Sequence, residues 1–308
     1  MSARNSEGDF HMSRDSRLRS GSTLAGRPAG RSISSGYPRF LGLETVEVEE
    51  ERSLLRLPFD ERLTTNGSLL HGGLAPSLVC IGGRILPSAA AGDDEVFVHT
   101  ASLHVSYVSA AFEQDVYCET RLLRRTTSVS FVESAIQGTD GTQVANAHAT
   151  VRYRHAREAG PTTLDRLEEP FHSSAPQRLP PGAPFLDHLG LEIEDRVDGR
   201  SRLRLGFREE LAGNAGFHEA ALFALFDVAG AMSAHSACGP SERPMRPATI
   251  ALQALGLTPS LPAEDVVAVS RCVRRDGDFF WNDVRIAVVR TNEVLVRGGL
   301  VYRIAQAR

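Results

Sequence analysis

A single carboxylate stands within a long apolar segment of the sequence. Residues 220–234 read AALFALFDVAGAMSA, and Asp227 is the only charged residue among them. A segment that is apolar all round a helix is typical of a fully enclosed core helix. Because burial of an unpaired carboxylate is costly or changes its protonation, we expect Asp227 to be a functional acid–base group or one half of a buried ion pair with an arginine.

Most of the sequence occurs twice, so the element that carries Asp227 has a counterpart. Leu41–Glu44 returns as Leu189–Glu192 148 positions later, and His71 matches His218 at a spacing of 147. Further pairs at nearly the same spacing are Leu57-Pro58-Phe59 with Leu205-Gly206-Phe207, Asn66 with Asn214, Arg121, Arg124 and Arg125 with Arg271, Arg274 and Arg275, and Tyr153 with Tyr302. Repeats of this length are whole domains rather than solenoid units.

Each copy predicts the same order of elements: two extended segments, a loop, an apolar helical stretch and four strands. In copy one these are Leu41–Val48, Ser53–Phe59, Leu74–Leu86, Val96–Val108, Asp115–Leu123, Ser128–Gln137 and Gln143–Arg154. In copy two they are Leu189–Val197, Ser201–Phe207, a helix from Glu219 to about Ala237, Thr249–Leu257, Asp265–Arg274, Phe279–Arg290 and Glu293–Ile304. One long helix among antiparallel strands is typical of an α+β fold.

The domain organisation follows from these elements. We expect a disordered tail over residues 1–38, a first domain over 39–154, a linker over 155–184 and a second domain over 185–308. The linker is rich in proline and charge, and Leu164–Glu169 could form a short helix within it. A linker of this length lets the two domains pack as a pseudo-twofold pair.

Composition agrees with two globular domains and excludes several classes of protein. The 308 residues are 42% hydrophobic and 23% charged, with a formal net charge of −4, which argues against a dedicated nucleic-acid binder. The four cysteines show no metal-ligand spacing. There is no window of about 18 apolar residues and no secretory signal, so we expect a cytoplasmic protein with no membrane-spanning segment.

The loop before the first helical stretch resembles that of a known family. Asn66–Gly73 is similar to the Asn…His-Gly-Gly loop of PaaI-like hotdog-fold acyl-CoA thioesterases, in which a helix follows and a catalytic Asp lies nine residues after the His. The strands Val96–Val108 and Thr249–Leu257 resemble the family's next core strand, which often carries Ser or Thr near its start. The resemblance covers nearly all of 40–154 and 185–304. It implies two tandem hotdog domains, each a curved antiparallel sheet wrapped around a central helix, packed as a pseudo-dimer.

Each copy has kept one half of the family's motif. Nine residues after His71 lies Cys80, whereas nine residues after His218 lies Asp227. Copy two in turn reads His-Glu-Ala where copy one reads His-Gly-Gly. Because the family builds each site across the dimer interface, the resemblance implies one complete site and one degenerate site. The complete site combines Asn66, His71, Gly72, Asp227 and Thr249, and the degenerate one combines Cys80, Thr100, Asn214, His218 and Glu219.

The resemblance also implies a chemistry for the complete site. The backbone N–H of Gly72, at a helix N-terminus, would stabilise the negative charge that develops on a thioester carbonyl oxygen, and Gly73 would contact substrate. Asp227 would act as general base or as nucleophile, while Asn66 and Thr249 would orient the carboxylate or the attacking water.

Several of these residues have a simpler interpretation. Asn66 and Thr249 recur in the other copy and could be turn and strand residues. His71 could order the loop, Glu219 could be structural or replace a lost group, and Cys80 could be a small core residue. Two arginine pairs at equivalent strand ends could bind coenzyme A phosphates or be solvated: Arg124 with Arg125, and Arg274 with Arg275.

Hydrolysis of an acyl-CoA thioester is the leading functional hypothesis. A non-catalytic acyl-CoA-binding or scaffold protein with decayed sites is the main alternative, and a hotdog enoyl-thioester hydratase or dehydratase is a third. No metal or cofactor is expected beyond the coenzyme A of the substrate. A homo-oligomer of double-hotdog chains is expected, with neither nucleic acid nor membrane as partner.

Overall fold

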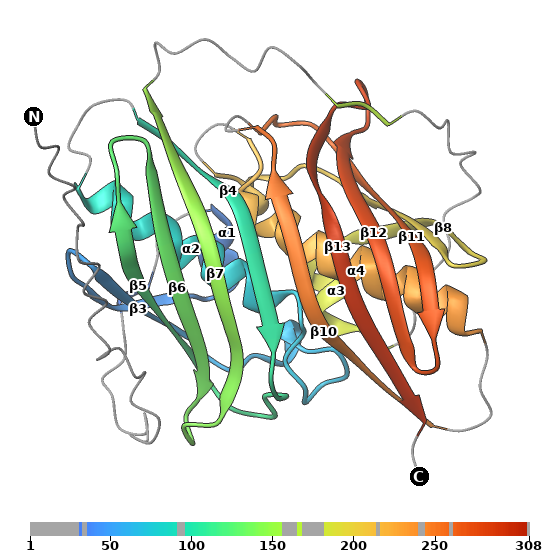
Figure 1. Ribbon diagram of the computed structural model, residues 1–308. Helices are drawn as coiled ribbons and strands as arrows, with labels where there is room; N and C mark the ends of the chain where they lie inside the picture. The colour runs from blue at the N-terminus through green and yellow to red at the C-terminus, as the bar shows by residue number, and fades with distance from the viewer. Residues whose placement is uncertain are drawn as a thin grey trace, which may run out of the picture.

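The two copies form one continuous antiparallel sheet. The computed structural model describes residues 31–32, 36–90, 96–155, 165–167, 182–213, 216–239, 244–258 and 261–306. Thirteen strands are hydrogen-bonded in the order β1-β2-β3-β5-β6-β7-β4-β10-β13-β12-β11-β9-β8 (Figure 1). Counted inward from β2 or inward from β8, equivalent strands follow in the same order. The two halves are therefore related by a pseudo-twofold axis between β4 and β10.

Apart from β1, the described elements of the two halves lie at equivalent positions. Copy one contains β1 Arg31–Ser32, α1 Gly36–Phe40, β2 Glu44–Val48, β3 Arg52–Leu57, α2 Leu74–Ala90, β4 Val96–Tyr107, β5 Val116–Arg125, β6 Val129–Gly138 and β7 Gln143–His155. Copy two contains α3 Pro184–Leu189, β8 Leu191–Val197, β9 Arg200–Leu205, α4 Glu219–Cys238, β10 Met245–Gly256, β11 Val266–Asp276, β12 Phe279–Val288 and β13 Val294–Gln306. Two 3-10 turns, η1 Glu61–Leu63 and η2 Glu209–Leu211, precede the loops that lead into α2 and α4.

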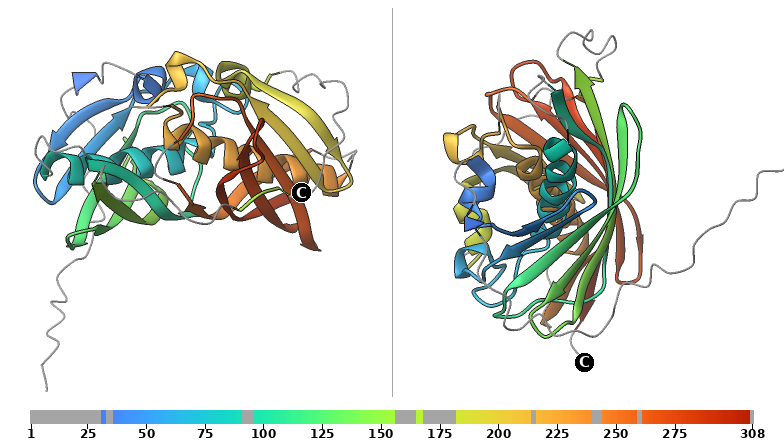
Figure 2. Two further views of the ribbon diagram at one scale, coloured as in Figure 1. Left: turned by 90° about the horizontal axis from the view of Figure 1, so that it is seen from above. Right: turned by 90° about the vertical axis from the view of Figure 1, so that its left-hand side faces the viewer.

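The halves meet along β4 and β10. Val105 pairs with Leu252 and Leu103 with Ala254 in antiparallel register. The sheet curves, and α2 and α4 both lie on its concave side, where they pack against each other (Figure 2). The N-termini of the two helices therefore meet near the axis, close to the loops that precede them.

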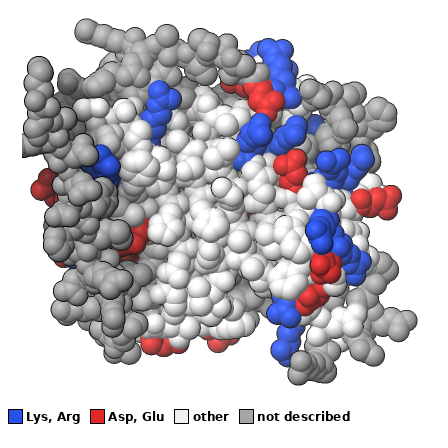
Figure 3. All heavy atoms as spheres, viewed as in Figure 1, with Lys and Arg blue, Asp and Glu red and all other residues white. Residues whose placement is uncertain are grey.

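The helix α4 is the most enclosed element of the fold. Its side chains from Glu219 to Gly230 are all buried, as an all-round apolar composition predicts. By length and composition α4 is the one helix among the described residues that could cross a membrane, but most of it is buried inside the protein as a core helix. The outer face of the sheet carries few charged side chains over its centre (Figure 3).

The structure corrects the ends of several expected elements. In each copy a short helix, α1 or α3, precedes the strand expected from Leu41 or Leu189, and Gly42 and Gly190 take positive φ angles just after these helices end. Of the short helix expected at Leu164–Glu169, the structure describes only residues 165–167. These are not helical, because Arg166 forms an isolated β-bridge with Glu293. The rest of the linker and almost all of the expected tail lie outside the described residues.

Candidate functional site

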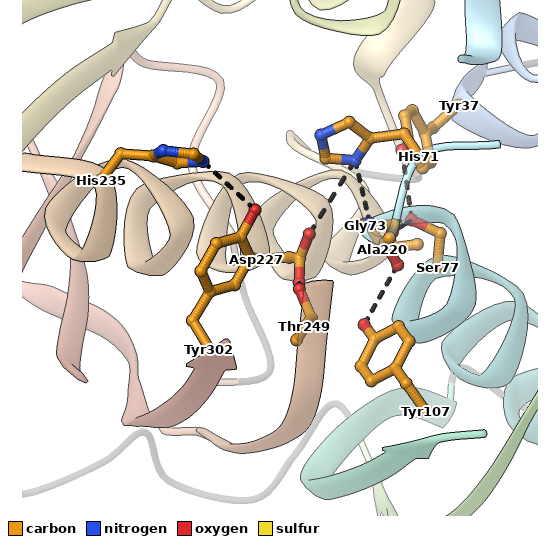
Figure 4. Close-up of polar contacts among 11 residues, drawn as sticks. Tyr37, His71, Gly73, Ser77, Tyr107, Ala220, Asp227, His235, Thr249 and Tyr302 are labelled. Carbon is orange, nitrogen blue, oxygen red and sulfur yellow. Dashed lines mark hydrogen bonds and ion pairs between the residues drawn. The ribbon is translucent and has the colours of Figure 1, made fainter. Parts of the chain in front are cut away.

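The carboxylate of Asp227 lies against the loop of the other copy. A Cβ atom added to Gly72 would stand 3.1 Å from Asp227 Oδ2 and 3.4 Å from Thr249 Oγ1. Asp227 is 2% exposed, and its Oδ1 accepts a hydrogen bond of 2.8 Å from Thr249 Oγ1 (Figure 4). The structure therefore brings together Gly72 from copy one with Asp227 and Thr249 from copy two, and only glycine leaves space between them.

Burial sets the protonation of Asp227. Desolvation raises the pKa of this carboxyl from 3.8 to about 6, while the hydrogen bond from Thr249 opposes the rise. At neutral pH the group is therefore mostly ionised but is a much stronger base than an exposed aspartate. None of the ion pairs described for the chain joins Asp227 to an arginine, so the ion-pair alternative finds no support among the described residues.

His71 orders the loop. Its Nδ1 accepts a hydrogen bond of 3.0 Å from the Gly73 backbone N–H, so the proton of a neutral ring is on Nε2. Burial lowers the pKa of His71 to about 4. Although Nδ1 lies 3.8 Å from Asp227 Oδ2, a neutral ring whose Nδ1 already accepts a hydrogen bond forms no ion pair with that carboxylate.

The carbonyl oxygen and the N–H of Gly72 belong to neighbouring peptide groups, and they differ in their partners. Tyr107, at the end of β4, donates a hydrogen bond of 3.0 Å to the Gly72 carbonyl oxygen. The Gly72 N–H donates to no group within the described part of the chain, and it lies just before the N-terminus of α2. A free N–H in this position points partial positive charge at an anionic oxygen.

Tyr107 and Ser77 are site residues that the sequence did not single out. Ser77 Oγ contacts the carbonyl oxygens of Gly73 and Ala220 at 3.0 Å each, which ties α2 to the start of α4. Tyr107 has a detectable signal, because its counterpart in copy two is Gly256. A Cβ at Gly256 would lie against the Thr100 carbonyl oxygen, so only one copy can carry a side chain here.

The second pseudo-symmetric site is filled by the protein itself. Glu219, the counterpart of Gly72, points its Oε2 at the Thr100 backbone N–H (2.9 Å) and at Arg84 Nη1 (2.9 Å). Cys80, the counterpart of Asp227, lies 3.8 Å from the same oxygen and 3.4 Å from Thr100 Oγ1. The carboxylate is 9% and Arg84 24% exposed, so a largely buried ion pair stands at the position that corresponds to Gly72 in the first site.

Cys80 and His218 of the second site stay uncharged near neutral pH. Burial raises the pKa of the Cys80 thiol to about 12, so it stays protonated. His218 Nδ1 accepts from the Ala220 N–H at 3.1 Å, and burial lowers the pKa of His218 to about 3. Asn214 lies outside the described residues.

None of the described contacts joins Asn66 or the arginine pairs to Asp227. Asn66 is exposed, and its Oδ1 accepts from the Leu69 N–H at 3.1 Å within the loop. The arginine pairs lie at the far ends of the helices. Arg125 bonds the Leu86 carbonyl oxygen and Arg275 that of Ala237.

The other arginine of each pair, Arg124 or Arg274, is exposed.

Among the described residues no group of three or more His, Cys, Asp or Glu side chains could hold a metal ion.

Comparison with known proteins identifies relatives about one copy long. No family model matches the chain. It is 30% identical over 105 residues to "Putative esterase VNG_1336C" of Halobacterium salinarum, covering 33% of this chain and 69% of that protein. It is 27% identical over 109 residues to "Putative esterase SSO2140" of Saccharolobus solfataricus, covering 35% of this chain and 76% of that protein.

Solved structures match nearly the whole chain at low identity. A "putative thioesterase" from Novosphingobium aromaticivorans has a TM-score of 0.64 at 15% identity, covering 84% of this chain and 97% of its own. A protein described by its hot dog fold from Alicyclobacillus acidocaldarius has 0.60 at 14%, covering 90% and 100%. The acyl-CoA thioesterase II TesB2 of Mycobacterium marinum has 0.59 at 14%, covering 88% and 99%. These likenesses show the fold: two tandem hotdog domains packed as a pseudo-dimer.

Proposed function

We propose that this chain, which belongs to the family of the Halobacterium salinarum relative, hydrolyses acyl-CoA thioesters at one composite site between its two copies. The observation that carries the proposal is the approach of Asp227 to Gly72, with 3.1 Å between Oδ2 and the position of an added Cβ. The names of the relatives, esterase and thioesterase, support the reaction class. The Asn66–Gly73 loop favours the PaaI-like type within it.

The site residues divide the work of hydrolysis. The thioester carbonyl oxygen accepts a hydrogen bond from the Gly72 N–H, which stabilises the charge that develops as the carbonyl carbon becomes tetrahedral. Thr249 holds the Asp227 carboxylate in place, and Tyr107 holds the Gly72 carbonyl oxygen. The raised basicity of Asp227 matches the task of taking a proton from water near neutral pH.

The proton balance closes on Asp227. The water oxygen bonds to the carbonyl carbon while its proton passes to Asp227. When the C–S bond breaks, the electron pair goes to sulfur and the Asp227 proton follows to give the free thiol. The alternative is direct attack by the carboxylate, which forms a mixed anhydride. In single-turnover hydrolysis in oxygen-18 water, label in Asp227 would identify the second case, because it arises only when water attacks the Asp227 carbonyl carbon of the anhydride.

Thiol release from a panel of acyl-CoAs tests the proposal. We expect wild type and Cys80→Ser to release thiol at similar rates, because Cys80 belongs to the filled site. Asp227→Asn should lose at least a hundredfold in kcat/KM. If wild type binds acyl-CoA but releases no thiol, the chain is an acyl-CoA-binding protein. If Asp227→Asn keeps its activity, the composite site is wrong.

The remaining expectations stay predictions. Binding of coenzyme A phosphates by Arg124, Arg125, Arg274 or Arg275, assembly into a homo-oligomer and a cytoplasmic location each require their own measurement.

A further inference from the structure

The filled second site holds one carboxylate oxygen in a defined position. Glu219 Oε2 accepts a hydrogen bond of 2.9 Å from the Thr100 backbone N–H and lies 2.9 Å from Arg84 Nη1. Cys80 Sγ lies 3.8 Å from the same oxygen. Because a pseudo-twofold axis relates the two copies, each of these groups has a counterpart in the composite site of Gly72 and Asp227. The position of the oxygen can therefore be transferred to that site.

The threonine N–H that binds this oxygen lies at an irregularity of its strand. In β4 the register with β7 shifts between Thr100 and Ser102, and in β10 the register with β13 shifts between Thr249 and Ala251. The pairing of β4 with β10 begins only beyond these positions, so neither threonine has a strand partner at the junction of the copies. An irregularity of this kind leaves backbone groups outside the ladder of hydrogen bonds.

The Thr249 N–H faces the composite site as the Thr100 N–H faces Glu219. In the part of the chain that the structure describes, no side chain accepts a hydrogen bond from the Thr249 N–H. A Cβ added to Gly72 would stand 3.4 Å from Thr249 Oγ1 and 3.1 Å from Asp227 Oδ2, so this threonine lines the space beside Gly72. Figure 4 shows it directly below the carboxylate.

The charges of the two sites differ, and the difference selects the oxygen that binds beside Asp227. The cation of the filled site has no counterpart, because Ala231 stands at the position of Arg84. The protonated Cys80 thiol is replaced by the Asp227 carboxylate. An anionic or carbonyl oxygen is repelled by that carboxylate. A water molecule can instead accept from the N–H and donate to the carboxylate at the same time.

We infer that the composite site binds the attacking water between the Thr249 backbone N–H and Asp227 Oδ2. The inference rests on the proposed thioesterase function and adds one catalytic group to it, the N–H of Thr249. Thr249 Oγ1 already holds Asp227 Oδ1 at 2.8 Å, so one residue orients both the base and the water. The water oxygen bonds to the thioester carbonyl carbon as its proton passes to Oδ2, while the Gly72 N–H holds the carbonyl oxygen.

A crystal structure of the wild-type chain, at a resolution that shows ordered waters, tests this position directly. We expect a water about 3 Å from both Thr249 N and Asp227 Oδ2. We expect none between Thr100 N and Glu219, where the carboxylate takes its place. A Thr249 N–H that donates to a strand carbonyl, or a water bound to Asp227 without it, overturns the inference.

Removal of the N–H alone tests its part in catalysis. Replacement of Thr249 by the corresponding α-hydroxy acid keeps the side chain and turns the amide into an ester. We expect kcat to fall about tenfold with KM unchanged, because the water and not the thioester loses a partner. The acidic limb of the pH profile should stay in place, since Oγ1 still bonds to Asp227. The same replacement at Thr100 is the matched control, and it should lower thermal stability without a change in kcat.

The outcomes separate the inference from the function on which it rests. An active wild type whose Thr249 ester keeps the full kcat overturns the inference alone. A wild type that releases no thiol from any acyl-CoA overturns the proposed function, and the inference with it. Thermal melting identifies an ester variant that has failed to fold, and the wild-type crystal structure then decides.

Discussion

Replacement of Asp227 by asparagine is predicted to stabilise the fold at alkaline pH while it removes activity. Burial raises the pKa of this carboxyl from 3.8 to about 6, so the folded chain binds the proton more tightly than the unfolded chain does. The ionised form is then the costly one in the folded state. The cost is absent below the unfolded pKa, grows as pH rises, and is complete above the folded pKa.

The size of the effect follows from that pKa. Each unit of pKa change corresponds to about 1.36 kcal/mol, so a rise of the Asp227 pKa from 3.8 to about 6 corresponds to about 3 kcal/mol. Asparagine has nearly the same shape and carries no charge. We therefore expect Asp227→Asn to gain up to about 3 kcal/mol in the free energy of unfolding at pH 8 and little or nothing at pH 4.

Urea denaturation of wild type and Asp227→Asn at pH 4, 6 and 8 measures this gain. Asp265→Asn is the matched control with the opposite sign. Arg204 and the Phe207 backbone N–H lower the pKa of Asp265, so this variant should lose stability at pH 8 and recover relative to wild type as the pH falls. A gain for Asp227→Asn that is equal at pH 4 and pH 8 would refute the reasoning, because it could not come from the ionised carboxylate.

Three further predictions concern the same contacts. The value of kcat/KM should fall about tenfold per pH unit below about pH 6, where Asp227 takes up its proton; a profile that is flat down to pH 5 would contradict a role as base. Thr249→Val removes a hydrogen bond that lowers the pKa of Asp227, so the acidic limb of that profile should move up by about one pH unit. Thr100→Val in the filled site should leave the limb in place, and equal shifts in both variants would disprove the assignment. Arg84→Ala leaves the Glu219 carboxylate buried without its partner and should cost about 3 kcal/mol in urea denaturation. Adding Glu219→Gly should return most of that stability, and a double variant as unstable as Arg84→Ala would show that the ion pair is not the cause.

Comparison of equivalent positions in the two copies was sufficient to single out two residues of the candidate site from the sequence. Asp227 was recognisable because its helix is otherwise apolar, and Gly72 because copy two has Glu219 in its place. Their meeting followed once the copies were packed as a pseudo-dimer. Tyr107 could have been found in the same way from its counterpart Gly256.

Other features depend on contacts that no local pattern encodes. The Arg84–Glu219 pair joins residues 135 positions apart in the chain, and it forms only because α2 and α4 cross near the pseudo-twofold axis. Asn66 illustrates the opposite case. Its Oδ1 accepts from the Ser68 and Leu69 backbone N–H groups, and its role in catalysis stays a prediction.

The central claim is that Gly72 of one copy and Asp227 of the other act in one site. A double-mutant cycle on kcat/KM with Gly72→Ala, Asp227→Asn and the double variant measures this directly. A methyl group at position 72 would stand 3.1 Å from Oδ2, so we predict that each single variant is severely impaired and that the double variant is little worse than Asp227→Asn alone. A Gly72→Ala variant with wild-type kcat/KM, or losses that multiply in the double variant as for two separate sites, would contradict the account.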